Sequence, residues 1–352
     1  MKTSIWSMRS PSTGQVEDPF SARFHPARSG RHPDGAGPAG GLRMSQVFSH
    51  EPVMLDSVVE LFRPVPAGVI VDATIGGGGH ARAVLHAHPQ SRLVGIDRDA
   101  AAIDAAGAAL VGFRERVTLR QARFDELGDV LDELGIDGVS GVLFDLGVSS
   151  AQFDQAERGF SYRADAPLDM RMDRRESPTA ADIVNEYELD ELTRLFRESG
   201  ETRFARRIAK AVIAARPVTT TGQLADVVRT AIPAATRRTG GHPARRVFQA
   251  LRIEVNRELE ILPHAIDTAI ERLVSEGRLV VLAYHSGEDR IVKDRLRGAA
   301  TGDCTCPPGL PCVCGAVPTV RLLNRGARKP SAEEVARNPR AEAARLRAAE
   351  KL

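Results

Sequence analysis

Short apolar runs alternate with helical patterns along most of the chain after Val47. The first run, Val69-Ile-Val-Asp-Ala-Thr, leads through four glycines into a helical pattern at 80–86, and a second run at 92–97 leads into an alanine-rich helix at 99–110. Three further apolar runs begin at residues 117, 141 and 278. Apolar strands separated by helices are typical of a parallel sheet covered on both faces. The pattern therefore predicts an α/β fold with a doubly wound, mostly parallel sheet.

The fourth and fifth predicted strands are too far apart for a single crossover helix to connect them. The intervening segment 151–250 carries apolar residues at helical spacing, so we expect an inserted helical subdomain there. The predicted helices lie at 188–199, 203–215, 222–232 and 245–275. The sheet and its covering helices are then expected from residues 44–150 and 251–330.

The two ends of the chain lack this alternation. Residues 1–43 are rich in Pro, Gly, Ser and Arg without a hydrophobic period, which is typical of a disordered extension. Met44 precedes the first patterned stretch and is an alternative start to Met1. Residues 331–352 are rich in Arg, and we expect a basic, partly helical C-terminal tail.

Composition argues against a membrane-spanning or secreted protein. Hydrophobic residues make up 42% of the chain, but no apolar run approaches the length of about 20 residues that a membrane span requires. The N-terminus also lacks the apolar core of a signal peptide. We therefore expect a cytoplasmic protein.

A glycine-rich loop, Gly76-Gly-Gly-Gly79, follows the first predicted strand. Glycines let a ligand approach the backbone closely, and the N-terminus of the next helix offers free N–H groups. Asp97 ends the second strand, where an acidic side chain accepts hydrogen bonds from ribose hydroxyls. This arrangement suits any adenosine-type cofactor, so a nicotinamide-dependent oxidoreductase and a merely structural turn are alternatives at this point.

Longer motifs along the chain narrow the class of protein. They are His50-Glu-Pro-Val-Met-Leu, Asp72-Ala-Thr-Ile-Gly-Gly-Gly-Gly-His80, Gly95-Ile-Asp-Arg-Asp99, Phe144-Asp-Leu-Gly-Val-Ser-Ser150, Glu157-Arg-Gly-Phe-Ser161, Pro167-Leu-Asp-Met-Arg-Met-Asp173, Phe248-Gln-Ala-Leu-Arg-Ile253 and Glu288-Asp-Arg-Ile-Val-Lys293. With these motifs the sequence resembles the ribosomal RNA small subunit methyltransferase H family, the 16S rRNA cytosine-N4 methyltransferases of bacteria. The resemblance covers about 47–350, with the motifs in the family's order.

The resemblance implies a class I methyltransferase fold that uses S-adenosylmethionine. It also implies cofactor contacts at seven positions. Asp97 would hold the ribose, Phe124 would lie against the adenine, and Asp145 would complete the site from the end of the fourth strand. The remaining implied cofactor residues are Gly78, Gly79 and His80 in the loop, and Gln152.

Two residues are candidates for a catalytic role. Asp145 is a candidate acceptor for the N–H groups of the cytosine amine, although it would serve only the cofactor in an alternative interpretation. His285 follows the fifth strand and is a candidate base, with a loop-ordering role as the alternative; next to it, Gly287 stands where the family usually has leucine. Phe160 or Tyr162 would supply a stacking face for a flipped base, or would simply pack in the interior.

Positive charge is concentrated in the predicted insertion. Residues 203–252 contain eleven Lys or Arg and one acid, Asp226, in a chain whose net charge is only +2. Four of the cations recur at helical spacing on one face: Arg203, Arg206, Arg207 and Lys210. Four others flank a Gly-Gly-His-Pro loop: Arg237, Arg238, Arg245 and Arg246. Because phosphate contacts dominate nucleic-acid affinity, this charge favours a nucleic-acid partner, with a merely solvated face as the alternative. The resemblance implies that the partner is 16S rRNA or the small ribosomal subunit. A non-catalytic RNA-binding protein on the same fold is an alternative function.

All four cysteines of the chain lie in one short segment, as Cys304-x-Cys306 and Cys312-x-Cys314. This spacing is unlike a disulfide framework. Four thiolates so close together suit a structural zinc ion, although zinc sites more often use C-x₂-C spacing. Free thiols and disulfides are the alternative interpretations.

Overall fold

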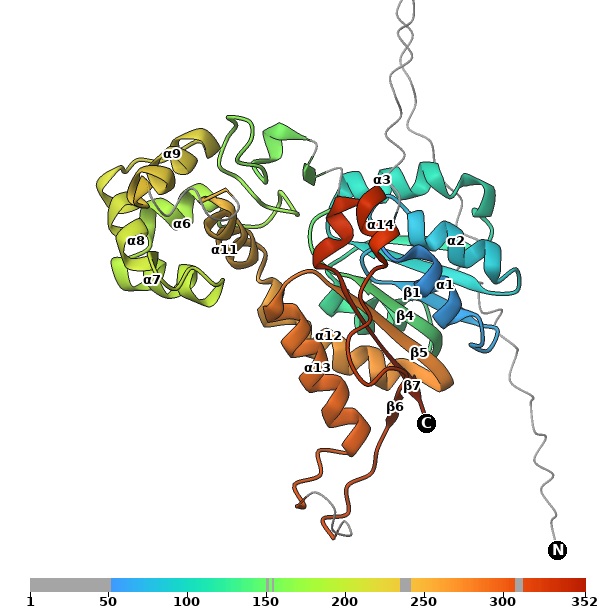
Figure 1. The fold of residues 1–352 in the computed structure, drawn as a ribbon. Coiled ribbons are helices and arrows are strands. Elements are labelled where there is room, and N and C mark those ends of the chain that lie inside the picture. The colour runs from blue at the N-terminus through green and yellow to red at the C-terminus, as the bar shows by residue number, and fades with distance from the viewer. Residues whose placement is uncertain (1–51, 150–151, 154, 235–241, 308–312) are drawn as a thin grey trace, which may run out of the picture.

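The computed structural model describes residues 52–149, 152–153, 155–234, 242–307 and 313–352. The predicted N-terminal extension 1–43 lies outside the described residues, as do Arg237, Arg238 and Cys312. The described part has two lobes, one built on a sheet and one made of helices (Figure 1). Among the described residues, no helix is long and apolar enough to cross a membrane.

A seven-stranded sheet forms the larger lobe, in the order β3-β2-β1-β4-β5-β7-β6. The first five strands pair in parallel, whereas β7 is antiparallel to both of its neighbours. The strands are β1 (Val69–Asp72), β2 (Arg92–Asp97), β3 (Val117–Gln121), β4 (Val139–Asp145), β5 (Leu273–Ala283), β6 (Val320–Leu322) and β7 (Arg345–Lys351). The first five strands include the five apolar runs predicted from the sequence, so the prediction of a mostly parallel α/β sheet is confirmed.

Helices cover both faces of this sheet, because side chains alternate between the two faces along each strand. Val71 and Val94 pack on one face, and Ile70 and Leu93 pack on the other. The first face is covered by α4 (Leu127–Glu133), α12 (Glu258–Arg272) and α13 (Ser286–Thr301). The second face is covered by α1 (Leu55–Phe62), α2 (Gly79–Ala87) and α3 (Ala100–Ala109).

The prediction of a basic C-terminal tail is wrong for residues 345–351. A short helix, α14 (Ala332–Arg337), is present, but β7 then inserts between β5 and β6. The physical reason is that every second side chain is buried, as in a β-strand: Arg345 and Arg347 alternate with the buried Leu346 and Ala348. The guanidinium of Arg347 pairs with Asp289 at 2.7 Å. Its charge is therefore neutralised within the fold.

The smaller lobe is helical, as predicted for the insertion, and has its own hydrophobic core from Phe160 to Val255. Its helices are α6 (Ala180–Glu186), α7 (Leu189–Glu198), α8 (Ala205–Ala214), α9 (Thr221–Ala231) and α11 (Arg245–Asn256). The single helix predicted over 245–275 is interrupted at Arg257, which has a left-handed φ of 52°. Because α11 packs in the helical lobe and α12 packs on the sheet, the lobes meet at Arg257, beyond the predicted boundary at residue 250.

Candidate active site

Polar side chains gather where the parallel strands end. Asp72 ends β1, Asp97 ends β2 and Asp145 ends β4, while Tyr284 follows β5 directly. Carboxyl ends of neighbouring parallel strands share one edge of a sheet, which is where open α/β sheets bind ligands. The topology thus brings together acids that are far apart in the sequence.

Asp97 organises the glycine-rich loop. Its Oδ2 accepts a hydrogen bond from the backbone N–H of Gly76 at 3.0 Å, and its Oδ1 accepts one from the N–H of Asp99 at 2.9 Å. Loss of solvent around the carboxyl raises the pKa of Asp97 to about 6, against the lowering effect of these two N–H groups. Each oxygen keeps a further lone pair, so the side chain can still accept a hydroxyl donor.

The loop requires glycine at two of the predicted cofactor positions. Gly78 has a φ of 77°, a conformation that side chains disfavour, and it caps the start of α2. A Cβ on Gly79 would lie 2.5 Å from Cγ of Pro52. Pro52 therefore packs directly against the backbone at the start of α2, whereas a Cβ on Gly77 would meet no described atom within 4 Å, so the loop has open space at Gly77.

Asp145 is the centre of a hydrogen-bonded cluster. The hydroxyl of Tyr284 donates to its Oδ1 at 2.6 Å, and Nε2 of the buried His80 lies 3.4 Å from its Oδ2. The backbone N–H of Asp145 donates to Oγ1 of Thr74 at 2.6 Å. With 26% of its side chain exposed, Asp145 is fixed in position and still reachable from outside.

The pKa values of three groups around Asp145 depart from their ordinary values. Burial, with a contribution from the charge of Asp145, raises the pKa of Asp72 to about 7, although His80 opposes this shift. Burial disfavours the charged form of His80, but the carboxylates of Asp145 and Asp72 outweigh it and raise the pKa of His80. Burial and the charge of Asp145 raise the pKa of Tyr284 well above its usual value, which keeps the phenol as a donor. Ionisable groups with shifted pKa values that gather at the ends of strands are typical of catalytic sites.

Gln152 lies in a neighbouring buried network. Its Nε2 donates to Oδ2 of Asp99 at 2.8 Å, and its Oε1 accepts from the N–H of Ser149 at 3.0 Å. Arg158 from the helical lobe also donates to Oδ2 of Asp99 at 2.8 Å. In this conformation the side chain of Gln152 links the loop after β4 to the turn after β2. A cofactor contact by Gln152 remains a prediction.

His285 caps the helix that follows β5. Its Nδ1 accepts from the N–H groups of Gly287 and Glu288, and its Nε2 lies 3.1 Å from Glu288. A Cβ on Gly287 would lie 3.1 Å from the imidazole, so the small residue suits this tight turn. His285 lines a cleft of about 320 Å³ between the lobes, together with residues of α7, α11 and α12. The cap agrees with a loop-ordering role, and a role as a base remains a prediction.

The candidate aromatic residues differ in exposure. Phe124 is half-buried and packs edge-on against Phe144, with ring centroids 5.9 Å apart. Phe160 is buried in the core of the helical lobe, so the interpretation as interior packing holds for it. Tyr162 is half-buried and stacks on the ring of His242 at 4.3 Å.

Sequence reasoning missed Tyr284 and Asp72 as site residues. Tyr284 directly follows a predicted strand, and Asp72 ends another, so their positions in the pattern were the available signal. The pairing of β5 with β4 brings the Tyr284 hydroxyl to Asp145. Because the sequence does not show this pairing, the role of these residues could not be predicted from it.

The exposed cations of α8 form a basic surface on the helical lobe. Arg206, Arg207 and Lys210 project from the face opposite the buried Ile208 and Val212, and Arg203 precedes the helix. Arg206 pairs with Asp190 at 2.7 Å. Not every cation counted in the insertion contributes to this surface. Arg216 binds backbone carbonyls of the lobe, and Arg252 pairs with Glu258.

The strand order, with an antiparallel β7 beside β5, and the glycine loop and acid at the ends of β1 and β2 define a class I S-adenosylmethionine-dependent methyltransferase. The chain belongs to the MraW methylase family, whose model matches residues 47–352. The alternative of a nicotinamide-dependent oxidoreductase is therefore set aside.

The chain is similar to named proteins over most of its length. A protein of Thermobifida fusca (strain YX) named ribosomal RNA small subunit methyltransferase H is 57% identical over 316 residues, covering 88% of this chain and 95% of its own length. A protein of the same name from Mycobacterium sp. (strain KMS) is 50% identical over 346 residues, covering 96% of this chain and 92% of its own length. A solved rRNA methylase from Streptococcus thermophilus is 12% identical, with a TM-score of 0.38 over 85% of this chain and 93% of that one.

Proposed function

We propose that this chain transfers a methyl group from S-adenosylmethionine to the N4 amine of a cytidine in the decoding region of 16S ribosomal RNA. Support for ribosomal RNA comes from the names of relatives that are more than half identical and from the basic helical lobe. The observation that carries the chemistry is the carboxylate of Asp145, held by Tyr284 at the end of β4 and partly exposed.

The residues at the strand ends fit the cofactor. Asp97 retains acceptor capacity for the ribose hydroxyls, and the open space beside Gly77 lets a ligand approach the loop that also holds Gly78 and Gly79. Phe124 offers a half-buried ring for the adenine after β3. When bound, S-adenosylmethionine supplies a methyl group activated by its positive sulfonium.

The protein's own contribution is to orient the amine and to remove a proton. The exocyclic N4 nitrogen of cytosine is a poor nucleophile because its lone pair is delocalised into the ring. Asp145 accepts a hydrogen bond from the amine and takes the proton that methylation displaces. Tyr284 and His80 hold the carboxylate in place, and such alignment supplies on the order of several kcal/mol.

The test is methylation of defined RNA by the purified chain. The chain and S-adenosylmethionine should add one methyl group to small-subunit rRNA, and nuclease digestion with mass spectrometry should identify it as N4-methylcytidine. Methylation at carbon 5 or on another base would overturn the assignment to N4. RNA binding without any methyl transfer would instead support the non-catalytic alternative.

A second prediction concerns the basic surface of α8. Replacing Arg203, Arg207 and Lys210 together by Ala should weaken rRNA binding, because phosphates without a cationic partner keep their condensed counterions. The slope of log K against log salt should become shallower by about 0.7–0.9 for each phosphate that the variant no longer neutralises. Binding measured over a salt series gives both quantities.

The matched control replaces Arg216, which binds carbonyls inside the lobe, by Lys. It should leave the salt slope unchanged even if it lowers stability. Cofactor affinity should be the same in both variants. A triple variant with an unaltered salt slope would place the RNA on a different surface.

A further inference from the structure

The loop between α13 and β6 projects away from the sheet (Figure 1). Its base is closed: a Cβ on Gly302 would lie 2.5 Å from the backbone nitrogen of Val317, and the N–H of Thr319 donates to the carbonyl of Ala299 at 2.9 Å. All four cysteines of the chain are in this loop. The loop therefore forms a small, separate unit at the end of α13.

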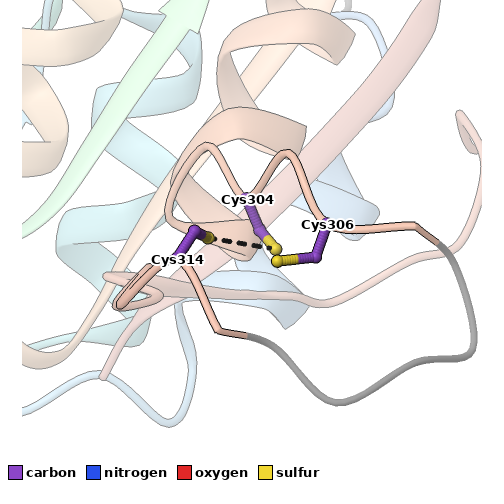
Figure 2. A group of neighbouring side chains, drawn as sticks. All are labelled: Cys304, Cys306 and Cys314. Atoms are coloured by element: carbon purple, nitrogen blue, oxygen red, sulfur yellow. Dashed lines mark hydrogen bonds between the residues drawn. The ribbon is translucent and has the colours of Figure 1, made fainter.

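Three thiols converge inside it. Figure 2 shows Cys304, Cys306 and Cys314 pointing toward one another from the two sides of the loop. Their Sγ atoms all lie within 4.8 Å of one another, and Sγ of Cys314 lies 3.6 Å from Sγ of Cys304. A disulfide would need about 2.05 Å. Two sulfurs that share a tetrahedral zinc at about 2.3 Å lie about 3.8 Å apart, which matches the observed pair.

The surroundings of the sulfurs favour the metal-binding form. The backbone N–H of Val313 donates to Sγ of Cys306 at 3.4 Å. A backbone N–H that donates to a sulfur favours the thiolate, which is the species that binds metals. Cys304 and Cys306 are half-buried and Cys314 is exposed, so an ion can enter from solvent.

Packing does not explain these cysteines. A cysteine without a reactive role usually behaves as a small buried hydrophobe. Here Val313 and Val317 in the same loop are 89% and 74% exposed, and none of the three thiols belongs to a described hydrophobic cluster. A loop with so few buried apolar side chains needs another source of stability to keep these three thiols together.

We propose that Cys304, Cys306 and Cys314 bind one Zn²⁺ ion as thiolates and that this ion holds the loop together. Soft thiolates select zinc over the hard cations Mg²⁺ and Ca²⁺. Cys312, expected from the sequence as a fourth ligand, lies outside the described residues, so the structure assigns three ligands. The site is at the opposite end of α13 from His285, roughly 24 Å along a 16-residue helix. Its role is therefore structural, separate from methyl transfer.

The experiment measures metal in the full chain, purified under reducing conditions without chelators. Elemental analysis should find about one zinc per chain, either as isolated or after Zn²⁺ is added and the excess removed. Cys304→Ser, Cys306→Ser and Cys314→Ser should each reduce zinc to background. The matched control Thr305→Ser lies between two ligands and should retain it. Cobalt replacing zinc should give thiolate-to-metal absorption bands that the cysteine variants lack.

A second measurement keeps the test independent of how the variants fold. Chelation of the unmodified chain should release the zinc and speed proteolytic cleavage within 303–316, and added Zn²⁺ should reverse both effects. Three outcomes would overturn the proposal: no zinc bound even after Zn²⁺ is added, equal zinc in the cysteine variants, or iron in place of zinc. A Cys304–Cys314 disulfide in the reduced preparation would do the same.

Discussion

Asp145→Asn is expected to lower the rate of methyl transfer by about 10²–10⁴-fold, the usual contribution of a positioned general base. The amide keeps an oxygen for the Tyr284 hydroxyl, which donates at 2.6 Å in the native protein. It cannot take a proton, and its NH₂ group presents donors where the cytosine amine needs an acceptor. Single-turnover methylation of rRNA measures the rate, and calorimetry measures cofactor affinity.

Two comparisons make this result interpretable. Tyr284→Phe removes one hydrogen bond but leaves the carboxylate, so the loss should be only about tenfold, corresponding to about 1.5 kcal/mol. Cofactor affinity of Asp145→Asn should change much less than the rate, since the glycine loop and Asp97 are untouched. An unchanged rate in Asp145→Asn would show that the carboxylate serves only the cofactor or the fold.

The second large effect is expected on stability. Asp99→Ala should lower the free energy of unfolding by about 3–5 kcal/mol, the cost of stranding one member of a buried ion pair. Arg158 and Asp99 are only 5% and 7% exposed and lie 2.8 Å apart, and Gln152 donates to the same carboxylate oxygen. The variant also loses the N-cap of α3, where Asp99 accepts from the N–H of Ala101. Urea unfolding measures the change.

Asp104→Ala is the matched control, since Asp104 is an exposed acid on the same helix. It should change the free energy of unfolding by no more than about 0.5 kcal/mol. Asp99→Asn has a single side-chain oxygen, which can accept from the cap N–H or from Arg158 but not from both, so its loss should fall between the two. A loss below about 1 kcal/mol in Asp99→Ala would mean that Arg158 regains solvent or another partner.

Local patterns were sufficient to predict most of the fold. The apolar runs at 69–74 and 92–97 are β1 and β2, because a buried parallel strand has apolar residues on both faces. The helix over 245–275 was predicted as one element because the helical spacing of apolar residues continues through Arg257. That spacing does not show that the backbone of Arg257 has a left-handed conformation. The strand at 345–351 was missed because its arginines were interpreted as a basic surface. Their spacing at every second position, which is typical of a strand, was not considered.

The site was harder to predict than the fold, for a physical reason. Gly78, Gly79 and Asp97 are local to a strand–loop–helix unit, so spacing along the chain locates them. Tyr284 reaches Asp145 from 139 residues away, through the pairing of β5 with β4. For His285 the sequence left two roles open, a base or a residue that orders the loop, and in the structure its side chain caps α13.

The position of β7 affects how the protein is made. Residues 345–351 pair with β5 over six residue pairs, from Arg278 to Ala283, yet they are translated long after β5. Until they leave the ribosome, β5 exposes a row of unpaired backbone groups beside Val280, Val281 and Leu282, which are fully buried in the finished fold. The sheet is therefore completed only after β7 has been synthesised. A ribosome that stalls after β5 holds a nascent chain whose open edge is prone to aggregate and is a natural substrate for chaperones.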